Sequence, residues 1–100
     1  MTYVFDLDGT LCETPGSDYA KATPIEARIS EVWRLKHAGH QIVIDTARGS
    51  GTGIDWVELT CEQLRVWGVP YDEVRIGRKA AGDVYVDDKG VSAEEFFSEA

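Results

Sequence analysis

Hydrophobic residues along this chain fall into four short runs, separated by longer stretches in which apolar and polar positions alternate at helical spacing. The short runs are residues 2–6, 42–44, 74–76 and 84–86, each of a length typical of one buried strand. Residues 24–38 and 54–67 predict helices, and a short third helix is expected after Ser92. Strands that alternate with helices in this way predict an α/β fold, a three-layer Rossmann-like sandwich on a mostly parallel sheet.

The predicted helices carry recognisable start and stop signals. Thr23 as N-cap, Pro24 at the first helical position and Glu26 at the third predict a capping box for the first helix. Gly39 is expected to end this helix and Gly68 the second one. The side chains expected to pack inward are Ile25, Ile29, Val32 and Trp33 in the first helix and Val57, Thr60, Cys61 and Leu64 in the second.

Length and charge limit what the protein can be. Its 100 residues predict one domain, 1–100, without room for a second core. The net charge of −8 opposes nucleic-acid backbones and anionic membranes, so neither is an expected partner. No basic region followed by a long apolar segment opens the sequence, which favours a cytoplasmic protein. Cys12 and Cys61 lack His partners at ligand spacing and are expected to be reduced thiols.

Two carboxylates directly follow the first predicted strand. If Leu7 turns toward the core, Asp6 and Asp8 both face the carboxyl end of the strand, where open α/β sheets bind their ligands. Two anions ~4 Å apart repel by about 4 kcal/mol at an effective dielectric constant near ~20, so the pair should recruit a cation or share a proton. A hard divalent ion is the natural counter-charge. The alternative is an Asx-type turn that uses Asp8 to satisfy loop amides before Gly9.

Polar residues also follow each of the other predicted strands. If the sheet is parallel with right-handed crossovers, all of them should collect at its carboxyl edge. Together with the first two acids, these residues provide carboxylates, a hydroxyl and cations, a set of groups suited to binding a phosphoryl group. These residues are Thr46 and Arg48 after the second strand, Lys79 after the third, and Asp87 and Asp88 after the fourth.

Several of these positions have a second interpretation. Thr46 could cap the turn before the second helix. Arg48 could contact the non-phosphate part of a substrate or pair with surface acids. Arg78 competes with Lys79 as the cation that stabilises a phosphate, and Trp56 could line the pocket or simply pack at the start of its helix.

In order and spacing, these residues resemble the motifs of the haloacid dehalogenase superfamily of aspartate-dependent phosphohydrolases. The similarity covers nearly the whole chain and is strongest to small capless members, often found beside capsule or lipopolysaccharide sugar genes. Family members often have Pro after the Lys of the third motif, whereas Ala80 stands here. The matching positions are Asp6, Asp8 and Thr10 for the Asp-x-Asp-x-Thr motif, Thr46 for the second motif, Lys79 for the third, and Asp87 and Asp88 for the fourth.

The resemblance assigns a role to each matching residue. It implies that Asp6 attacks phosphorus and becomes an aspartyl phosphate, and that Asp8 protonates the leaving oxygen and then deprotonates water. Thr46 would donate to a phosphoryl oxygen, and Lys79 would offset developing charge. The implied magnesium ligands are the Asp6 carboxylate, the main-chain carbonyl of Asp8, and the acidic pair Asp87 and Asp88, while Thr10 and Arg48 are the candidates for substrate binding.

The expected function is therefore that of a Mg²⁺-dependent phosphomonoesterase, acting on a phosphorylated sugar or a related small metabolite. The chain leaves no room for a cap domain, so the site should be open unless a neighbouring subunit covers it in a homo-oligomer. Two alternatives stay open: a receiver-like signalling domain with its phosphoacceptor at Asp45, and a catalytically idle relative that serves as a binding module.

Overall fold

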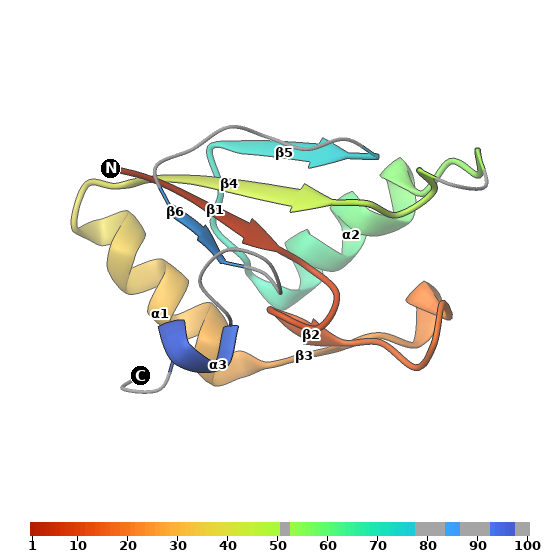
Figure 1. Ribbon diagram of the computed structural model, residues 1–100, viewed down its shortest axis with the longest axis horizontal. Helices are drawn as coiled ribbons and strands as arrows, with labels where there is room; N and C mark the ends of the chain where they lie inside the picture. Colours follow the sequence, from red (N-terminus) through yellow and green to blue (C-terminus); the bar gives the residue numbers. More distant parts are fainter. Residues whose placement is uncertain (51–52, 78–83, 87–92, 98–100) are drawn as a thin grey trace.

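The computed structural model describes residues 1–50, 53–77, 84–86 and 93–97, and these form a small α/β domain (Figure 1). The main sheet has the strand order β5-β4-β1-β6, and every neighbouring pair is parallel. Arrowheads of β1, β4 and β5 therefore point to the same side of the molecule in Figure 1. The strands are β1 (Thr2–Asp6), β4 (Gln41–Thr46), β5 (Glu73–Ile76) and β6 (Val84–Val86).

Helices connect these strands much as the hydrophobic pattern indicates. Helix α1 (Glu26–His37) lies between β1 and β4, α2 (Val57–Trp67) lies between β4 and β5, and α3 (Ala93–Phe96) follows β6. The segment between β1 and α1 adds a small antiparallel pair, β2 (Cys12–Glu13) with β3 (Thr23–Pro24), and a 3-10 turn, η1 (Tyr19–Lys21). No helix in the described part of the chain is long and apolar enough to cross a membrane.

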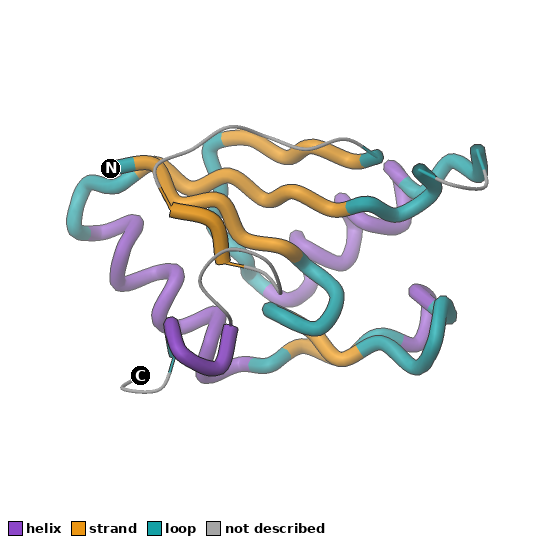
Figure 2. Tube along the Cα trace, viewed as in Figure 1, coloured by secondary structure: helices purple, strands orange, loops and turns teal. Residues whose placement is uncertain are grey.

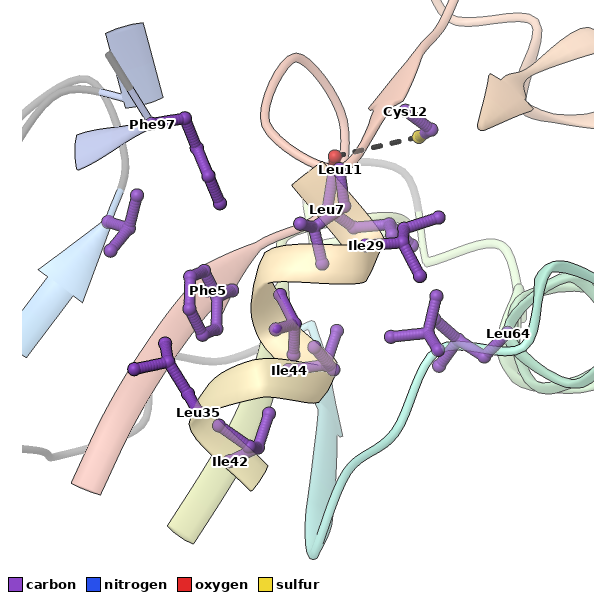
Figure 3. Packing of buried hydrophobic residues seen from close by; sticks show 13 residues of the cluster. Phe5, Leu7, Leu11, Cys12, Ile29, Leu35, Ile42, Ile44, Leu64 and Phe97 are labelled. Atoms are coloured by element: carbon purple, nitrogen blue, oxygen red, sulfur yellow. Dashed lines mark hydrogen bonds between the residues drawn. The ribbon is translucent and has the colours of Figure 1, made fainter. Parts of the chain in front are cut away.

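One face of the main sheet carries the principal core. Crossovers from β1 to β4 and from β4 to β5 advance in the same direction along the sheet, and right-handed connections of that kind place both helices on one face. The described helices thus make two layers with the sheet, and the second helical layer of the predicted sandwich is not among the described residues. Figure 3 shows this packing, in which Phe5, Ile42 and Ile44 of the strands meet Ile29 and Leu35 of α1, Leu64 of α2 and Phe97.

Strand alternation divides the functional residues between the two faces. Phe5 is buried in the core with the helices, so its neighbour Asp6 points to the opposite face, as does Asp45 next to Ile44. Thr46 returns to the helix side and is 2% exposed. The carboxyl edge of the sheet is therefore where side chains from both faces come together.

Helix α1 starts later than its sequence signal indicates, and the predicted capping box is wrong. Thr23 and Pro24 pair with β2 as strand β3, and α1 begins at Glu26 with no side-chain N-cap hydrogen bond. Strand pairing and the hydrogen bond from the Ile25 amide to the Leu11 carbonyl (2.9 Å) hold this segment extended. Tertiary contacts have thus overridden a local preference. The predicted helix end at Gly39 is confirmed by its φ of +94°.

Helix α2 is shorter at its start than predicted, because it begins at Val57 rather than at residue 54. Asp55 accepts a hydrogen bond from the Val57 amide through its carboxylate (2.9 Å). Val57, expected to face inward, is 49% exposed. In the first helix, Trp33 is likewise 41% exposed rather than packed on the sheet, and its Nε1–H donates to the Gly68 carbonyl (2.7 Å). The inward residues of α2 are Thr60, Gln63 and Leu64.

The two sides of α2 should respond very differently to truncation. We expect Leu64→Ala, at a position with no exposed surface, to lower the free energy of unfolding by about 2–5 kcal/mol. Val66→Ala, on the same helix but 64% exposed, is the matched control and should change it by less than about 0.5 kcal/mol. Urea denaturation followed by circular dichroism measures both, and equal effects would contradict this packing.

Candidate functional site

The carboxyl ends of the parallel strands form one edge, and the loops that follow β1 and β4 leave from it (Figure 2). Asp6 ends β1 and Thr46 ends β4, so Asp8 and Arg48 begin the adjoining loops. Within the described ranges, no group of three His, Cys, Asp or Glu residues could hold a metal ion. Four of the predicted site residues and competitors lie outside those ranges: Arg78, Lys79, Asp87 and Asp88.

The turn after β1 has the form that the sequence indicates. Leu7 has no exposed surface, and its carbonyl accepts hydrogen bonds from the amides of Thr10, Leu11 and Cys12. Asp6 and Asp8, on either side of Leu7, are half-buried. The Leu7 amide also donates to the Asp6 carboxylate (2.9 Å). This tight turn places the two acids at the sheet edge.

Thr10, a predicted substrate-binding residue, is only 3% exposed. Its main-chain carbonyl accepts a hydrogen bond from Arg28 Nη1 (3.0 Å), which ties the turn to α1. Its burial places Thr10 in the framework of the turn rather than on the surface of the site.

A second acid stands next to Asp6 across the sheet. Asp6 and Asp45 are in register on β1 and β4, and both point to the face opposite the helices. Neighbouring strands lie about 4.8 Å apart, so this edge concentrates negative charge. On the far side, Arg75 of β5 is in register with Asp45 and pairs with Glu73 (2.7 Å). The edge around Asp6 therefore carries two neighbouring carboxylates, with Arg75 beside the second of them.

Asp8 is held by a buried arginine. Arg48 donates from Nε to Asp8 Oδ2 (2.9 Å) and from Nη2 to Asp8 Oδ1 (2.7 Å), a bidentate pair. Thr14 donates its hydroxyl to the same Oδ1 (2.6 Å). The Arg48 side chain is 0% exposed, whereas that of Asp8 is 25% exposed. One carboxylate thus joins a buried cation to the surface of the site.

The other side of the Arg48 guanidinium is equally well satisfied. Its Nη1 donates to the Thr60 hydroxyl (3.1 Å) and to Gln63 Oε1 (2.6 Å), both on α2. The Tyr19 ring lies over the guanidinium, 4.7 Å from ring centroid to Cζ. The interpretation of Arg48 as a substrate contact needs correction, because its side chain is fully buried and engaged by protein acceptors, among them the partly exposed acid Asp8.

Thr46 is in contact with the same segment. Its hydroxyl oxygen accepts a hydrogen bond from the Arg48 amide (3.3 Å), which is the turn-capping arrangement considered from the sequence. Because the hydroxyl accepts in this contact, its own hydrogen is left to donate elsewhere. Capping the turn and donating to a phosphoryl oxygen are therefore compatible roles.

The contacts of Asp8 determine its protonation. Burial raises the pKa of Asp8, but the hydrogen bonds from Arg48 and Thr14, with the charge of Arg48, outweigh it and lower the pKa below the ordinary 3.8. Asp8 is therefore a carboxylate at neutral pH. Beside it, burial raises the pKa of the Cys12 thiol to about 11, and the residue has no exposed surface. Cys12 thus stays a protonated thiol, and the negative charge of Asp8 acts in the same direction as burial.

Sequence reasoning missed the residues that surround Arg48. Thr60 was expected to face inward, but no function was attached to it. Gln63, three residues later on the same face of α2, is 8% exposed, and a polar residue at a buried helical position is the signal that could have revealed the network. Thr14 and Tyr19 carry no such signal, because they lie in an irregular segment whose contacts are tertiary.

The turn that carries Arg48 depends on a glycine. Gly49 has φ of +82°, and a Cβ built there would lie 2.2 Å from the Ile54 carbonyl oxygen and 3.1 Å from a ring carbon of Trp56. Trp56 in turn packs edge-to-face on Tyr19, with ring centroids 5.0 Å apart. Trp56 thus supports the Tyr19 ring that covers the Arg48 guanidinium.

Known structures support this fold. No protein-family model and no curated protein matches the chain. The crystal structure of a protein from Vibrio cholerae is similar over 100% of this chain and 90% of that one, with 33% identity and a TM-score of 0.77. Our chain belongs to the family of that protein. A chain of the Pnkp1/Rnl/Hen1 complex is also similar, with a TM-score of 0.64 and 20% identity over 98% of this chain and 33% of that one.

These likenesses differ in what they show. At its level of identity, the Vibrio cholerae relative shares both fold and family with this chain. The similarity to the Pnkp1/Rnl/Hen1 chain shows the fold alone, and this chain spans about a third of that chain's length. The shared architecture is a small α/β domain on a mostly parallel sheet.

The Asp8–Arg48 pair should make stability depend on pH in the acid range. Because the pKa of Asp8 is lowered on folding, the pair stabilises the native state above the unfolded-state pKa, and this contribution is lost as the pH falls through the folded-state value. We expect Asp8→Asn to lower the free energy of unfolding most near about pH 7, with a difference from wild type that shrinks toward about pH 2. Urea titrations across this range measure it, and a constant difference would contradict the ion pair.

Gly49 and Gly53 provide a matched pair for testing the turn. Both have positive φ, but nothing lies within 4 Å of a Cβ at Gly53. Gly53→Ala should cost about 1–2 kcal/mol of stability from the backbone alone. Gly49→Ala should cost about 1–3 kcal/mol more, because the methyl group meets the Ile54 carbonyl. Thermal unfolding measures both variants, and equal effects would show that this close approach is not required.

Proposed function

We propose that this protein is a magnesium-dependent phosphomonoesterase of the haloacid dehalogenase type, acting through an aspartyl phosphate on Asp6. The observation that carries this proposal is the meeting of Asp6, Asp8 and Thr46 at the carboxyl edge of two adjacent parallel strands. Edges of this kind are where open α/β sheets bind ligands. The motif resemblance adds Lys79 and Asp87, which follow β5 and β6 in the sequence.

Asp6 is the proposed nucleophile. One of its carboxylate oxygens forms a bond to phosphorus as the bond from phosphorus to the leaving oxygen breaks, and water then attacks the aspartyl phosphate to release inorganic phosphate. The Leu7 amide donates to Asp6 Oδ1 and so restrains the rotation of this carboxylate. A fixed orientation lowers the cost of aligning the nucleophile with its target.

Asp8 is the proposed proton-transfer residue. Its pairing with Arg48 favours the carboxylate form, which is the form that takes a proton from the attacking water in the second step. In the first step Asp8 must carry a proton to the leaving oxygen, against the charge of Arg48. The geometry therefore supports the general-base role of Asp8 more directly than its general-acid role.

The carboxylates at this edge support the proposal of Mg²⁺ as the cofactor. Asp6 and Asp45 place carboxylates side by side on adjacent strands, and hard oxygen ligands are those that Mg²⁺ prefers. The Asp6 carboxylate, the main-chain carbonyl of Asp8, and Asp87 with Asp88 would hold the ion. When bound, it would offset the negative charge of the acids and the phosphoryl group.

We further propose a phosphorylated sugar or a related small metabolite as substrate, and a second copy of the chain as the cover of the site. The motif resemblance supports this substrate class, because similar capless proteins accompany sugar-pathway genes. The chain's net charge of −8 is consistent with a small substrate drawn in by local cations rather than a polyanion.

Loss of the nucleophile should abolish turnover. We expect Asp6→Asn to lower the rate of phosphate release from p-nitrophenyl phosphate with Mg²⁺ by about three orders of magnitude or more, because a carboxamide is a poor nucleophile. Asp18→Asn, an exposed acid, is the control and should leave the rate unchanged. Full activity of Asp6→Asn would refute the proposed mechanism.

The position of the phosphoryl group separates this proposal from a receiver-like domain. In acid-quenched wild-type protein, reduction with borohydride and peptide mass spectrometry should locate the label at Asp6. Labelling at Asp45 instead, retained in Asp6→Asn, would favour the signalling alternative.

A further inference from the structure

The proposed reaction leaves one feature of this site unexplained, which is the set of α2 contacts around the fully buried guanidinium of Arg48. Arg48 is 0% exposed, and removing such a charge from water is costly unless the protein supplies partners. It supplies four hydrogen bonds and an aromatic face, all described above. The fold therefore compensates the buried charge of Arg48 with a complete set of specific partners.

The partners of Arg48 come from segments far apart in the sequence. Asp8 follows β1, Tyr19 belongs to η1, and Thr60 and Gln63 belong to α2. Both polar groups of the Gln63 side chain are bound: its Oε1 accepts a hydrogen bond from Arg48, and its Nε2 donates one to the Tyr19 carbonyl (2.6 Å). The guanidinium thus connects α2 and η1 to the loop that carries Asp8.

The hydrogen bonds on the two sides of the guanidinium have different effects. Toward Asp8, the bidentate contact fixes the plane of the carboxylate, and Thr14 adds a third hydrogen bond. Toward α2, Thr60 and Gln63 fix the guanidinium itself, a long side chain that otherwise has many rotamers. The α2 side chains therefore fix the orientation of Arg48, and Arg48 in turn fixes the orientation of the Asp8 carboxylate.

We infer that Thr60 and Gln63 are positioning residues of the proposed active site: they hold Arg48, and Arg48 holds the carboxylate of Asp8 in one orientation at the carboxyl edge of the sheet. This inference rests on the proposed phosphatase function. It also explains why the arginine next to the second motif is buried, since its role is directed at Asp8 rather than at the substrate.

The inference is tested by steady-state kinetics with p-nitrophenyl phosphate and Mg²⁺. Gln63→Met keeps the size of the side chain and removes both of its polar groups, and Thr60→Val removes the hydroxyl. We expect each to lower kcat by about 10-fold to 100-fold with KM within about twofold of wild type, because the substrate contacts are intact while Asp8 is misaligned. Thr60→Ser, which restores a hydroxyl, should recover most of the loss.

A double-mutant cycle shows whether the effect passes through Asp8. In an Asp8→Asn background, Gln63→Met should change the residual rate by less than about twofold, because the group that it positions is already absent. Glu62→Gln, next to Gln63 but exposed and paired with Arg65, is the matched control on α2 and should leave kcat unchanged.

The possible failures are distinguishable. Wild-type kcat in Gln63→Met and Thr60→Val, or an equal loss with and without Asp8, would overturn the positioning role while leaving the phosphatase proposal intact. Failure of both variants to fold, seen by circular dichroism, would show that the two side chains act in stability alone and would also overturn it. A folded wild type without phosphatase activity would refute the proposed function and the inference with it.

Discussion

The ion pair between Asp8 and Arg48 is the constraint on which the carboxyl edge of this protein depends. Removing one partner of a buried pair leaves an uncompensated charge and costs about 3–5 kcal/mol in general, a large share of the stability of a 100-residue domain. The pair joins the loops that follow β1 and β4, which the sheet alone would not organise. Loops fixed in this way are suited to carry the side chains of the candidate site.

The sequence predicted the elements of this fold better than their boundaries. Short apolar runs identified the strands correctly, since a continuous run of this length is suited to a parallel strand buried on both sides. The start of α1 was wrong because the pairing of Thr23 and Pro24 with β2 is a tertiary contact that a local capping signal cannot reveal. The positions of the described helices, all on one face, depend on strand order, which the residues themselves do not specify.

The residues of the candidate site likewise fall into those that a local sequence pattern reveals and those that it does not. Asp6, Asp8 and Thr46 could be found because each directly follows a run that predicts a strand. Arg48 was found too, but its surroundings were not, since Asp8 is 40 residues away in sequence and Thr60 and Gln63 are 12 and 15 residues away. Periodicity shows which face of α2 is buried, yet it gives no indication that this face meets a cation instead of a leucine.

The two faces of the sheet give the carboxyl edge its chemical asymmetry. Asp6 and Asp45 point away from the helices, whereas Thr46 points toward the helices. Asp8 follows Leu7, where the chain passes between these two environments, and Arg48 restrains its carboxylate. In the proposed reaction, the nucleophile needs charge compensation and the proton-transfer group needs a fixed partner. A sheet edge at which a polar face meets a packed one can supply both.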